Sequence, residues 1–178
     1  MRIVGGKYRS RVLYSFDGNE VRPTSDKARE SIFNILQNKI RGAKFLDLFC
    51  GTGAMGIEAI SREAESVVFN DKARKSIELT KKNLEKLGVK DGFTISNSDA
   101  ETFLKNTPKQ FDIIYVDPPY ATDLGLKSLS VIKRAMADGC VVIFEDEKPA
   151  DFEIEGLKIT DRRKYGRVHL TFFEKEIK

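Results

Sequence analysis

The run Phe45-Leu46-Asp47-Leu48-Phe49-Cys50-Gly51-Thr52-Gly53-Ala54-Met55-Gly56 carries the clearest structural signal in the chain. It joins a short apolar segment to the pattern G-x-G-x-x-G. Glycines at this spacing allow a sharp turn from a strand into a helix, and they let the backbone approach a cofactor at the helix N-terminus. Strand-to-helix turns also use glycine where no ligand binds. The pattern therefore predicts a strand, a tight loop and a helix, and the neighbouring residues have to indicate what the loop holds.

Apolar runs and helical periods alternate on both sides of this loop. We expect strands over residues 44–48, 66–70, 93–96, 111–116 and 140–145, and two more near residues 157–161 and 168–174. Helices are predicted from Thr24 or Ser25 to Gly42, from the glycine loop to about Ser61, and over residues 72–87, 100–105 and 124–137. This alternation predicts a doubly wound α/β fold with a mostly parallel seven-stranded sheet and an antiparallel C-terminal hairpin at its edge.

The composition fits one globular domain and excludes several classes of protein. The chain has 178 residues, and no apolar run approaches the roughly 20 residues of a membrane-spanning helix. The first residues lack the apolar stretch of a secretory signal, so we expect a cytoplasmic protein. With only Cys50, Cys140 and His169 available, neither a disulfide framework nor a metal site is expected.

Positive charge is concentrated near the N-terminus. Residues 1–22 are predicted to form a small basic hairpin or extended arm, with a turn at Asp17-Gly18-Asn19, that belongs to the same domain as residues 23–178. The net charge of +4 and the pI near 9.0 favour a polyanionic partner. The cations expected to contact its phosphates are Arg2, Lys7, Arg9, Arg11, Arg22 and Arg29. A solvated surface explains each single cation equally well.

Three aspartates stand where the first three predicted strands end. Asp47 precedes the first glycine of the loop, where it would repel a pyrophosphate but attract an ammonium or a sulfonium. Asp71 is suitably spaced to bind a ribose, and Asp99 could accept a hydrogen bond from an adenine amino group. Each alone is also explained as a helix cap or turn residue. Together they favour S-adenosylmethionine over a nicotinamide dinucleotide.

The segment Asp117-Pro118-Pro119-Tyr120 follows the most apolar strand directly. Two prolines fix the backbone and supply no N–H, so the Asp117 carboxylate and the Pro118 carbonyl form a preset pair of acceptors. An exocyclic amine of a nucleic-acid base could donate to both, which would direct its lone pair at a methyl donor. Tyr120 offers a face on which that base could stack. A purely structural strand-to-loop turn would explain the same residues.

On these motifs the sequence resembles the RsmD family of bacterial 16S ribosomal RNA guanine-N2 methyltransferases. The resemblance spans nearly the whole chain. It rests on the opening run 2–8, Arg22-Pro23-Thr24 with the residues up to Asn34, the run 47–58, Asp117-Pro118-Pro119-Tyr120 and Arg163-Lys164-Tyr165-Gly166. It implies a Rossmann-like class I methyltransferase fold. It also implies that the cofactor is held by Asp47, Gly51, Gly53, Asp71 and Asp99; their neighbours Phe49, Thr52 and Ala100 complete the predicted site.

The resulting hypothesis is an S-adenosylmethionine-dependent methyltransferase that modifies the N2 of a guanine in 16S ribosomal RNA. Its partner would be the small ribosomal subunit or an assembly intermediate, and the protein itself would be a monomer. The nearest rival is a DNA adenine-N6 methyltransferase, although the chain is short for a separate DNA-reading domain. The residues are also compatible with a nicotinamide-dependent oxidoreductase or with a non-catalytic RNA-binding assembly factor.

Overall fold

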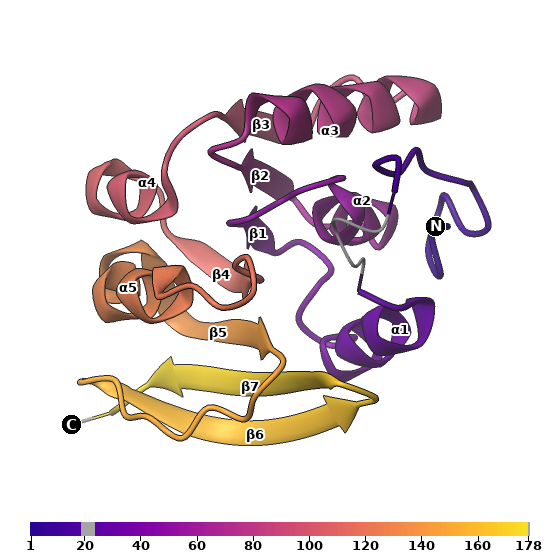
Figure 1. Cartoon of the computed structure of the whole chain (residues 1–178). Helices are drawn as coiled ribbons and strands as arrows, with labels where there is room; N and C mark the ends of the chain where they lie inside the picture. Colours follow the sequence, from indigo (N-terminus) through magenta and orange to yellow (C-terminus); the bar gives the residue numbers. More distant parts are fainter. Residues whose placement is uncertain (19–23, 178) are drawn as a thin grey trace.

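Seven strands form one sheet in the order β3-β2-β1-β4-β5-β7-β6 in the computed structural model, which describes residues 1–18 and 24–177 (Figure 1). Strands β1 to β5 are parallel, and β7 is antiparallel to both of its neighbours, β5 and β6. The predicted sheet with its antiparallel C-terminal hairpin is therefore confirmed. The strands are β1 (Lys44–Asp47), β2 (Ser66–Asn70), β3 (Phe93–Ser96), β4 (Phe111–Val116), β5 (Met136–Asp146), β6 (Leu157–Tyr165) and β7 (Val168–Lys175).

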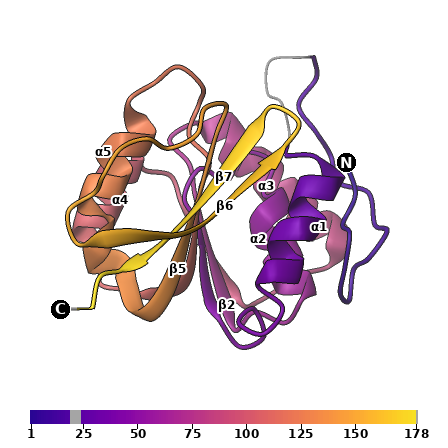
Figure 2. The ribbon, with the colours of Figure 1, turned by 90° about the horizontal axis from the view of Figure 1, so that it is seen from below.

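Helices cover both faces of this sheet. On one face lie α1 (Asp26–Ile35), α2 (Ala54–Ser61) and α3 (Arg74–Leu87); on the other lie α4 (Ala100–Asn106) and α5 (Leu124–Val131) (Figures 1 and 2). Because successive side chains of a strand point to opposite faces, each strand contributes side chains to two hydrophobic cores, one on each face of the sheet. Phe45 and Tyr115 pack with α1 to α3, whereas Leu46 and Ile114 pack with α4 and α5.

Two predicted helices end earlier than expected. The helix predicted over residues 124–137 stops at Val131, is followed by a 3₁₀ turn (Ile132–Ala135), and gives way to β5 at Met136, which pairs with Phe111. The first helix starts after its cap Ser25, one of the two predicted caps, but ends at Ile35 and continues in turns. Beyond the two helix ends, the apolar residues Leu36, Ile40, Ile132 and Met136 are buried in the core, although Ile35 is exposed.

The N-terminal arm is a short hairpin, but its turn lies elsewhere than predicted. Arg2 and Val12 form an antiparallel bridge, so the chain reverses between them. Asp17 and Gly18 form only a bend after the hairpin, and Asn19 lies outside the described residues. The base of the hairpin is bound to α2, because both oxygens of the buried Glu58 accept backbone N–H groups of the arm, from Val4 at 3.0 Å and Gly5 at 2.8 Å.

The sheet has two edge strands of different character. β3 has four residues, and β6 has nine, with an irregular register between Ile159 and Asp161. The outer part of β6 carries the exposed cations Arg162, Arg163 and Lys164. Among the helices of the described residues, none is long and apolar enough to cross a membrane.

Candidate active site

The parallel strands β1 and β4 are neighbours in space although two strands and their helices separate them in sequence. Their registers place Asp47 opposite Tyr115, so Asp117 follows two residues beyond, at the same carboxyl edge. The order of connections reverses between these strands, and ligands of open α/β sheets bind at such a switch point. The structure thus brings together the glycine loop after β1 and the Asp117-Pro118-Pro119-Tyr120 turn after β4.

The glycine loop is a tight turn that α3 supports from one side. Gly51 and Gly53 have left-handed backbones, with φ of 54° and 82°, and Gly53 precedes the first residue of α2. A Cβ on Gly53 would lie 2.9 Å from the Thr80 methyl group, whereas one on Gly51 would meet nothing within 4 Å. Gly51 therefore leaves its side of the loop open to a ligand, and Gly53 allows the loop to lie against α3.

Two polar residues on the buried side of α3 fasten this loop. The Thr80 hydroxyl donates to the Gly51 carbonyl at 3.1 Å. The Asn83 amide nitrogen donates to the Thr52 carbonyl at 2.9 Å and to the Tyr14 carbonyl at 3.1 Å. The Asn83 amide oxygen accepts from the Tyr14 N–H at 2.7 Å. We call the hydrogen bonds of Asn83 the Asn83 bridge, since they join the arm to the glycine loop.

Asp47 fastens the other side of the loop. Its side chain is buried, and its Oδ2 accepts a hydrogen bond from the Gly56 N–H at 3.0 Å, inside the first turns of α2. Burial raises the pKa of Asp47 to about 7; the bond from Gly56 opposes the shift, and the charge of Asp71 adds to it. A nearby cation would lower this pKa and restore the charged form.

Asp71 and Asp99 both make backbone hydrogen bonds at the ends of β2 and β3. Asp71 accepts from the N–H groups of Gly51 at 3.0 Å and Ala73 at 2.8 Å. Asp99 caps α4 by accepting from Thr102 at 3.1 Å. Both side chains remain half-buried rather than enclosed. Of their predicted companions in the cofactor site, Phe49 and Thr52 are half-buried in the loop, and Ala100 is buried as the first residue of α4.

The Asp117 carboxyl lies among other acids. Burial raises its pKa well above the ordinary value, and the charges of Glu145, Asp47 and Asp146 add to the shift, in that order. These groups come from the ends of β1, β4 and β5, so the carboxyl groups of three strands lie close together at the carboxyl edge of the sheet. Like charges gathered in this way disfavour one another until a cation arrives. The cluster therefore suits a positively charged ligand and opposes a pyrophosphate.

The turn after Asp117 is packed on one side and open on the other. Pro118 is buried against the start of α5, where a Cβ on Gly125 would lie 3.0 Å from its ring. Pro119 is exposed, and its carbonyl accepts from the Thr122 hydroxyl at 2.7 Å. Tyr120 is half-buried. The turn therefore presents an exposed surface next to Asp117 while its buried side is held by packing against α5.

Beneath Asp117 lies a buried polar group that none of the sequence motifs indicates. The Tyr115 hydroxyl and the Thr24 hydroxyl both donate to Oε2 of Glu145, the latter at 3.0 Å. The sequence predicts Thr24 only as a helix cap. A polar residue at the end of each apolar strand, Tyr115 in residues 111–116 and Glu145 in residues 140–145, is the signal that could have found this group. It ties the segment before α1 to the ends of β4 and β5.

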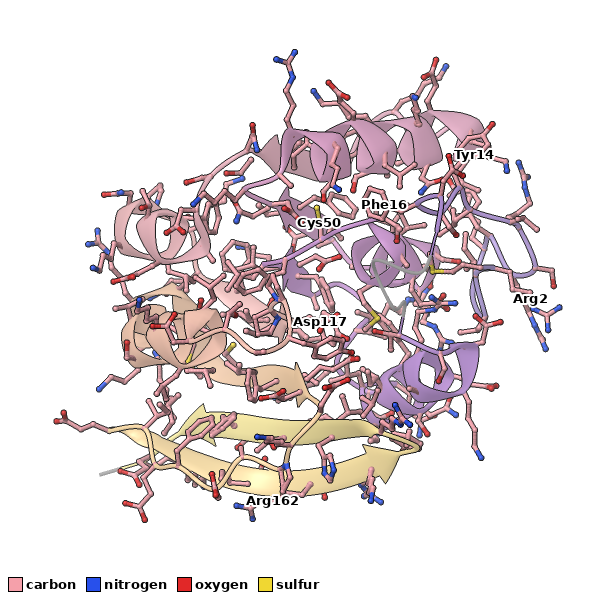
Figure 3. The ribbon with its side chains drawn as sticks, in the orientation of Figure 1. Arg2, Tyr14, Phe16, Cys50, Asp117 and Arg162 are labelled. Atoms are coloured by element: carbon pink, nitrogen blue, oxygen red, sulfur yellow. The ribbon has the colours of Figure 1, made fainter. Side chains whose placement is uncertain are left out.

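Most of the predicted phosphate-binding cations are exposed, and one is not. Arg2, Lys7, Arg9 and Arg11 lie on the surface of the arm, with Arg2 far from Asp117 (Figure 3). Arg22 lies outside the described residues. The prediction for Arg29 is wrong: its side chain is 1% exposed and forms ion pairs with Asp26 at 2.8 Å and Glu58 at 3.6 Å. Arg29 holds α1, α2 and the arm together and has no surface to offer a phosphate.

Comparisons with known proteins agree over nearly the full length. The sequence model of the family described as Conserved hypothetical protein 95 matches residues 1–174. Ribosomal RNA small subunit methyltransferase D of Escherichia coli is 32% identical over 99% of this chain and 90% of its own length. YlbH of Bacillus subtilis is 34% identical over 98% of this chain and 99% of its own length. The solved structure of yhhF from Escherichia coli has a TM-score of 0.88 at 28% identity, covering 100% of this chain and 99% of that one.

Proposed function

Since the chain belongs to the Conserved hypothetical protein 95 family, the RsmD family, and has the class I methyltransferase fold, we propose that it transfers a methyl group from S-adenosylmethionine to the N2 of a guanine in 16S ribosomal RNA. The observation that carries this proposal is the meeting of two motifs at one sheet edge. Asp47, the last residue of β1, and Asp117, directly after the last residue of β4, stand at the ends of neighbouring strands, and the charge of Asp47 adds to the cost of ionising Asp117.

The residues around the glycine loop fit S-adenosylmethionine in charge and shape. The open side of Gly51 offers room, and the half-buried Asp71 carboxylate beside it could accept from ribose hydroxyls. Asp47 and its acidic neighbours favour the cationic ammonium and sulfonium. When bound, this cofactor supplies an electrophilic methyl group and a good leaving group. Phe49, Thr52, Gly53, Asp99 and Ala100 complete the proposed cofactor site.

The Asp117 turn would orient the amine. Its carboxylate and the Pro118 carbonyl would each accept one N–H of the guanine N2, which leaves the nitrogen lone pair directed away from the turn. Tyr120 would contact the face of the base. As the new N–C bond forms, the nitrogen becomes positively charged, and the ionised Asp117 stabilises this charge. Asp117 could also take up the released proton, because its environment raises its pKa.

Transfer of labelled methyl to isolated small ribosomal subunits tests the proposal. Subunits from cells lacking this protein should accept methyl, and subunits from cells containing it should not. Digestion to nucleosides and mass spectrometry should identify N2-methylguanosine. Label appearing instead on the N6 of adenine in DNA, or an absence of transfer together with thermal stabilisation by NADH but not by S-adenosylhomocysteine, would reject it.

A further inference from the structure

A groove runs between the N-terminal arm and α3, on the side of α3 that faces the arm. It has a volume of about 660 Å³ and is lined by Tyr14, Ser15, Asp17, Leu79, Lys82, Glu85 and Lys86. The helix contributes one stripe, since residues 79, 82 and 86 follow a helical period. Tyr14, Ser15 and Asp17 belong to the predicted arm, with Asp17 in its predicted turn, and no sequence motif assigns a role to the residues that α3 contributes.

One cation of the groove lies against its aromatic ring, since the ammonium of Lys86 lies 4.2 Å from the centre of the Tyr14 ring. A second such pair lies outside the groove lining, where the ammonium of Lys75 is 5.7 Å from the centre of the Phe16 ring. The Tyr14 side chain is nevertheless 50% exposed, so much of it remains open to solvent. Positive charge that follows a backbone, next to rings on which bases stack, is the usual chemistry of single-stranded nucleic acid binding.

The groove is held in a fixed position relative to the glycine loop. The Asn83 bridge binds the backbone N–H and carbonyl of Tyr14 and, through the same side chain, the Thr52 carbonyl. Asn83 is fully buried. In Figure 3, Phe16 lies between Tyr14 and the glycine-loop residue Cys50. A strand lying in the groove would therefore lead toward the site where the methyl group is transferred.

We propose that this groove binds the single-stranded RNA next to the target guanine, with its phosphates on Lys82 and Lys86 and a base against Tyr14. The proposal rests on the proposed function and extends it by assigning a path for the substrate across α3. Asp17 and Glu85 also line the groove, and their negative charge limits its affinity for RNA. Removing a negative charge should therefore strengthen binding, just as removing a positive charge should weaken it.

The double variant Lys82→Ala/Lys86→Ala removes the proposed phosphate contacts from exposed positions. Its KM for unmethylated small subunits should rise about tenfold. For a short unstructured RNA oligonucleotide, the slope of the logarithm of the binding constant against the logarithm of the salt concentration should become shallower by about one for each lysine. Binding of S-adenosylhomocysteine should not change. The matched control is Lys44→Ala/Lys158→Ala, which removes the same charge from exposed positions at the starts of β1 and β6, where neither lysine lines the groove.

Two further positions test the chemistry of the groove. Tyr14→Ala should weaken oligonucleotide binding about tenfold, while Tyr14→Phe keeps the ring and should bind nearly as wild type. Both preserve the Asn83 bridge, which uses only the backbone of Tyr14. Glu85→Gln should bind RNA more tightly.

The results separate this inference from the proposed function. Equal KM values for the groove and control variants, with wild-type methylation intact, would overturn the groove and leave the function standing. The proposal would also be overturned if the Lys82→Ala/Lys86→Ala variant lost binding to anionic phospholipid vesicles while its RNA binding stayed unchanged. If the wild-type protein methylates nothing, the proposed function fails, yet the oligonucleotide measurements still decide whether the groove holds RNA.

Discussion

At the scale of single residues, the site is built from carboxyl groups whose charge is unfavourable in the folded protein. Asp47 and Asp117 each lie at a strand end among other acids, and burial is the largest cause of the raised pKa in both. A group that prefers to be neutral in the folded protein but ionises freely in the unfolded chain makes stability depend on pH.

For Asp47 the raised pKa fixes the sign of this dependence. Its pKa is 3.8 in the reference state and about 7 in the fold, so the folded protein holds the proton more tightly. Stability should fall as the pH rises from about 4 to about 7, by up to about 4 kcal/mol. Asp47→Asn keeps an acceptor for Gly56 and should flatten this slope. Urea unfolding at several pH values measures the change of unfolding free energy with pH. An equal change in the wild-type protein and in Asp47→Asn would contradict the prediction.

For Asp117 the prediction concerns catalysis. Asp117→Ala removes an acceptor for the amine and should lower kcat about 10²-fold or more, as loss of one positioned polar contact to a transition state commonly does. Affinity for S-adenosylhomocysteine should be nearly retained, because Asp117 is proposed to contact the amine of the base rather than the cofactor. Single-turnover methylation and calorimetry give the two values. Asp91→Ala, an exposed aspartate before β3, is the control.

At the scale of elements, the turn from β1 into α2 depends on two demands at Gly53, its left-handed backbone and its closeness to Thr80. Gly53→Ala should therefore destabilise the fold by more than the roughly 1 kcal/mol expected of the backbone strain alone, and it should weaken S-adenosylhomocysteine binding. Gly42→Ala is the matched control, because Gly42 has a φ of 75° but no atom within 4 Å of the added Cβ. Equal losses in unfolding free energy would mean that the contact with Thr80 does not matter.

The elements are predictable where a single local rule governs them. Strands 66–70, 93–96 and 111–116 match the structure at both ends, because turn residues bound each apolar run. The helix expected to reach residue 137 ends at Val131, since pairing of Met136 with Phe111 takes over a segment whose hydrophobic period alone indicates a helix.

The residues of the candidate site also fall into two groups, those that a local motif indicates and those whose role depends on partners distant in sequence. Asp47 and Asp117 follow from motifs of adjacent residues, and the structure brings them together. Thr24, Thr80 and Asn83 act through partners distant in sequence, and nothing in the local pattern distinguishes them from ordinary polar residues of a helix or its cap. The prediction for Arg29 fails for the same reason: its partner Glu58 lies 29 positions away, and only the fold reveals that the pair is buried.

At the scale of the whole molecule, the arm is joined to the rest by buried polar contacts. Glu58 accepts from the arm at Val4 and Gly5 and pairs with Arg29 and Arg62. Glu58→Gln would leave Arg29 poorly compensated, and loss of a partner from a buried ion pair costs about 3–5 kcal/mol. Glu63→Gln breaks an exposed pair with Arg41 and should cost less than about 1 kcal/mol. Unfolding midpoints compare the two, and similar values would argue against a structural role for Glu58.

The two outer strands of the sheet bear on how the molecules behave at high concentration. An exposed strand edge presents unpaired backbone groups that another chain can extend into an aggregate. β3 offers only four residues for such an addition. β6 is longer, but its irregular register interrupts a flat edge, and Arg162, Arg163 and Lys164 would bring like charges together if two β6 strands met. Both borders thus resist intermolecular strand pairing, and replacing these three cations with valine would turn the longer border into a template for fibre growth.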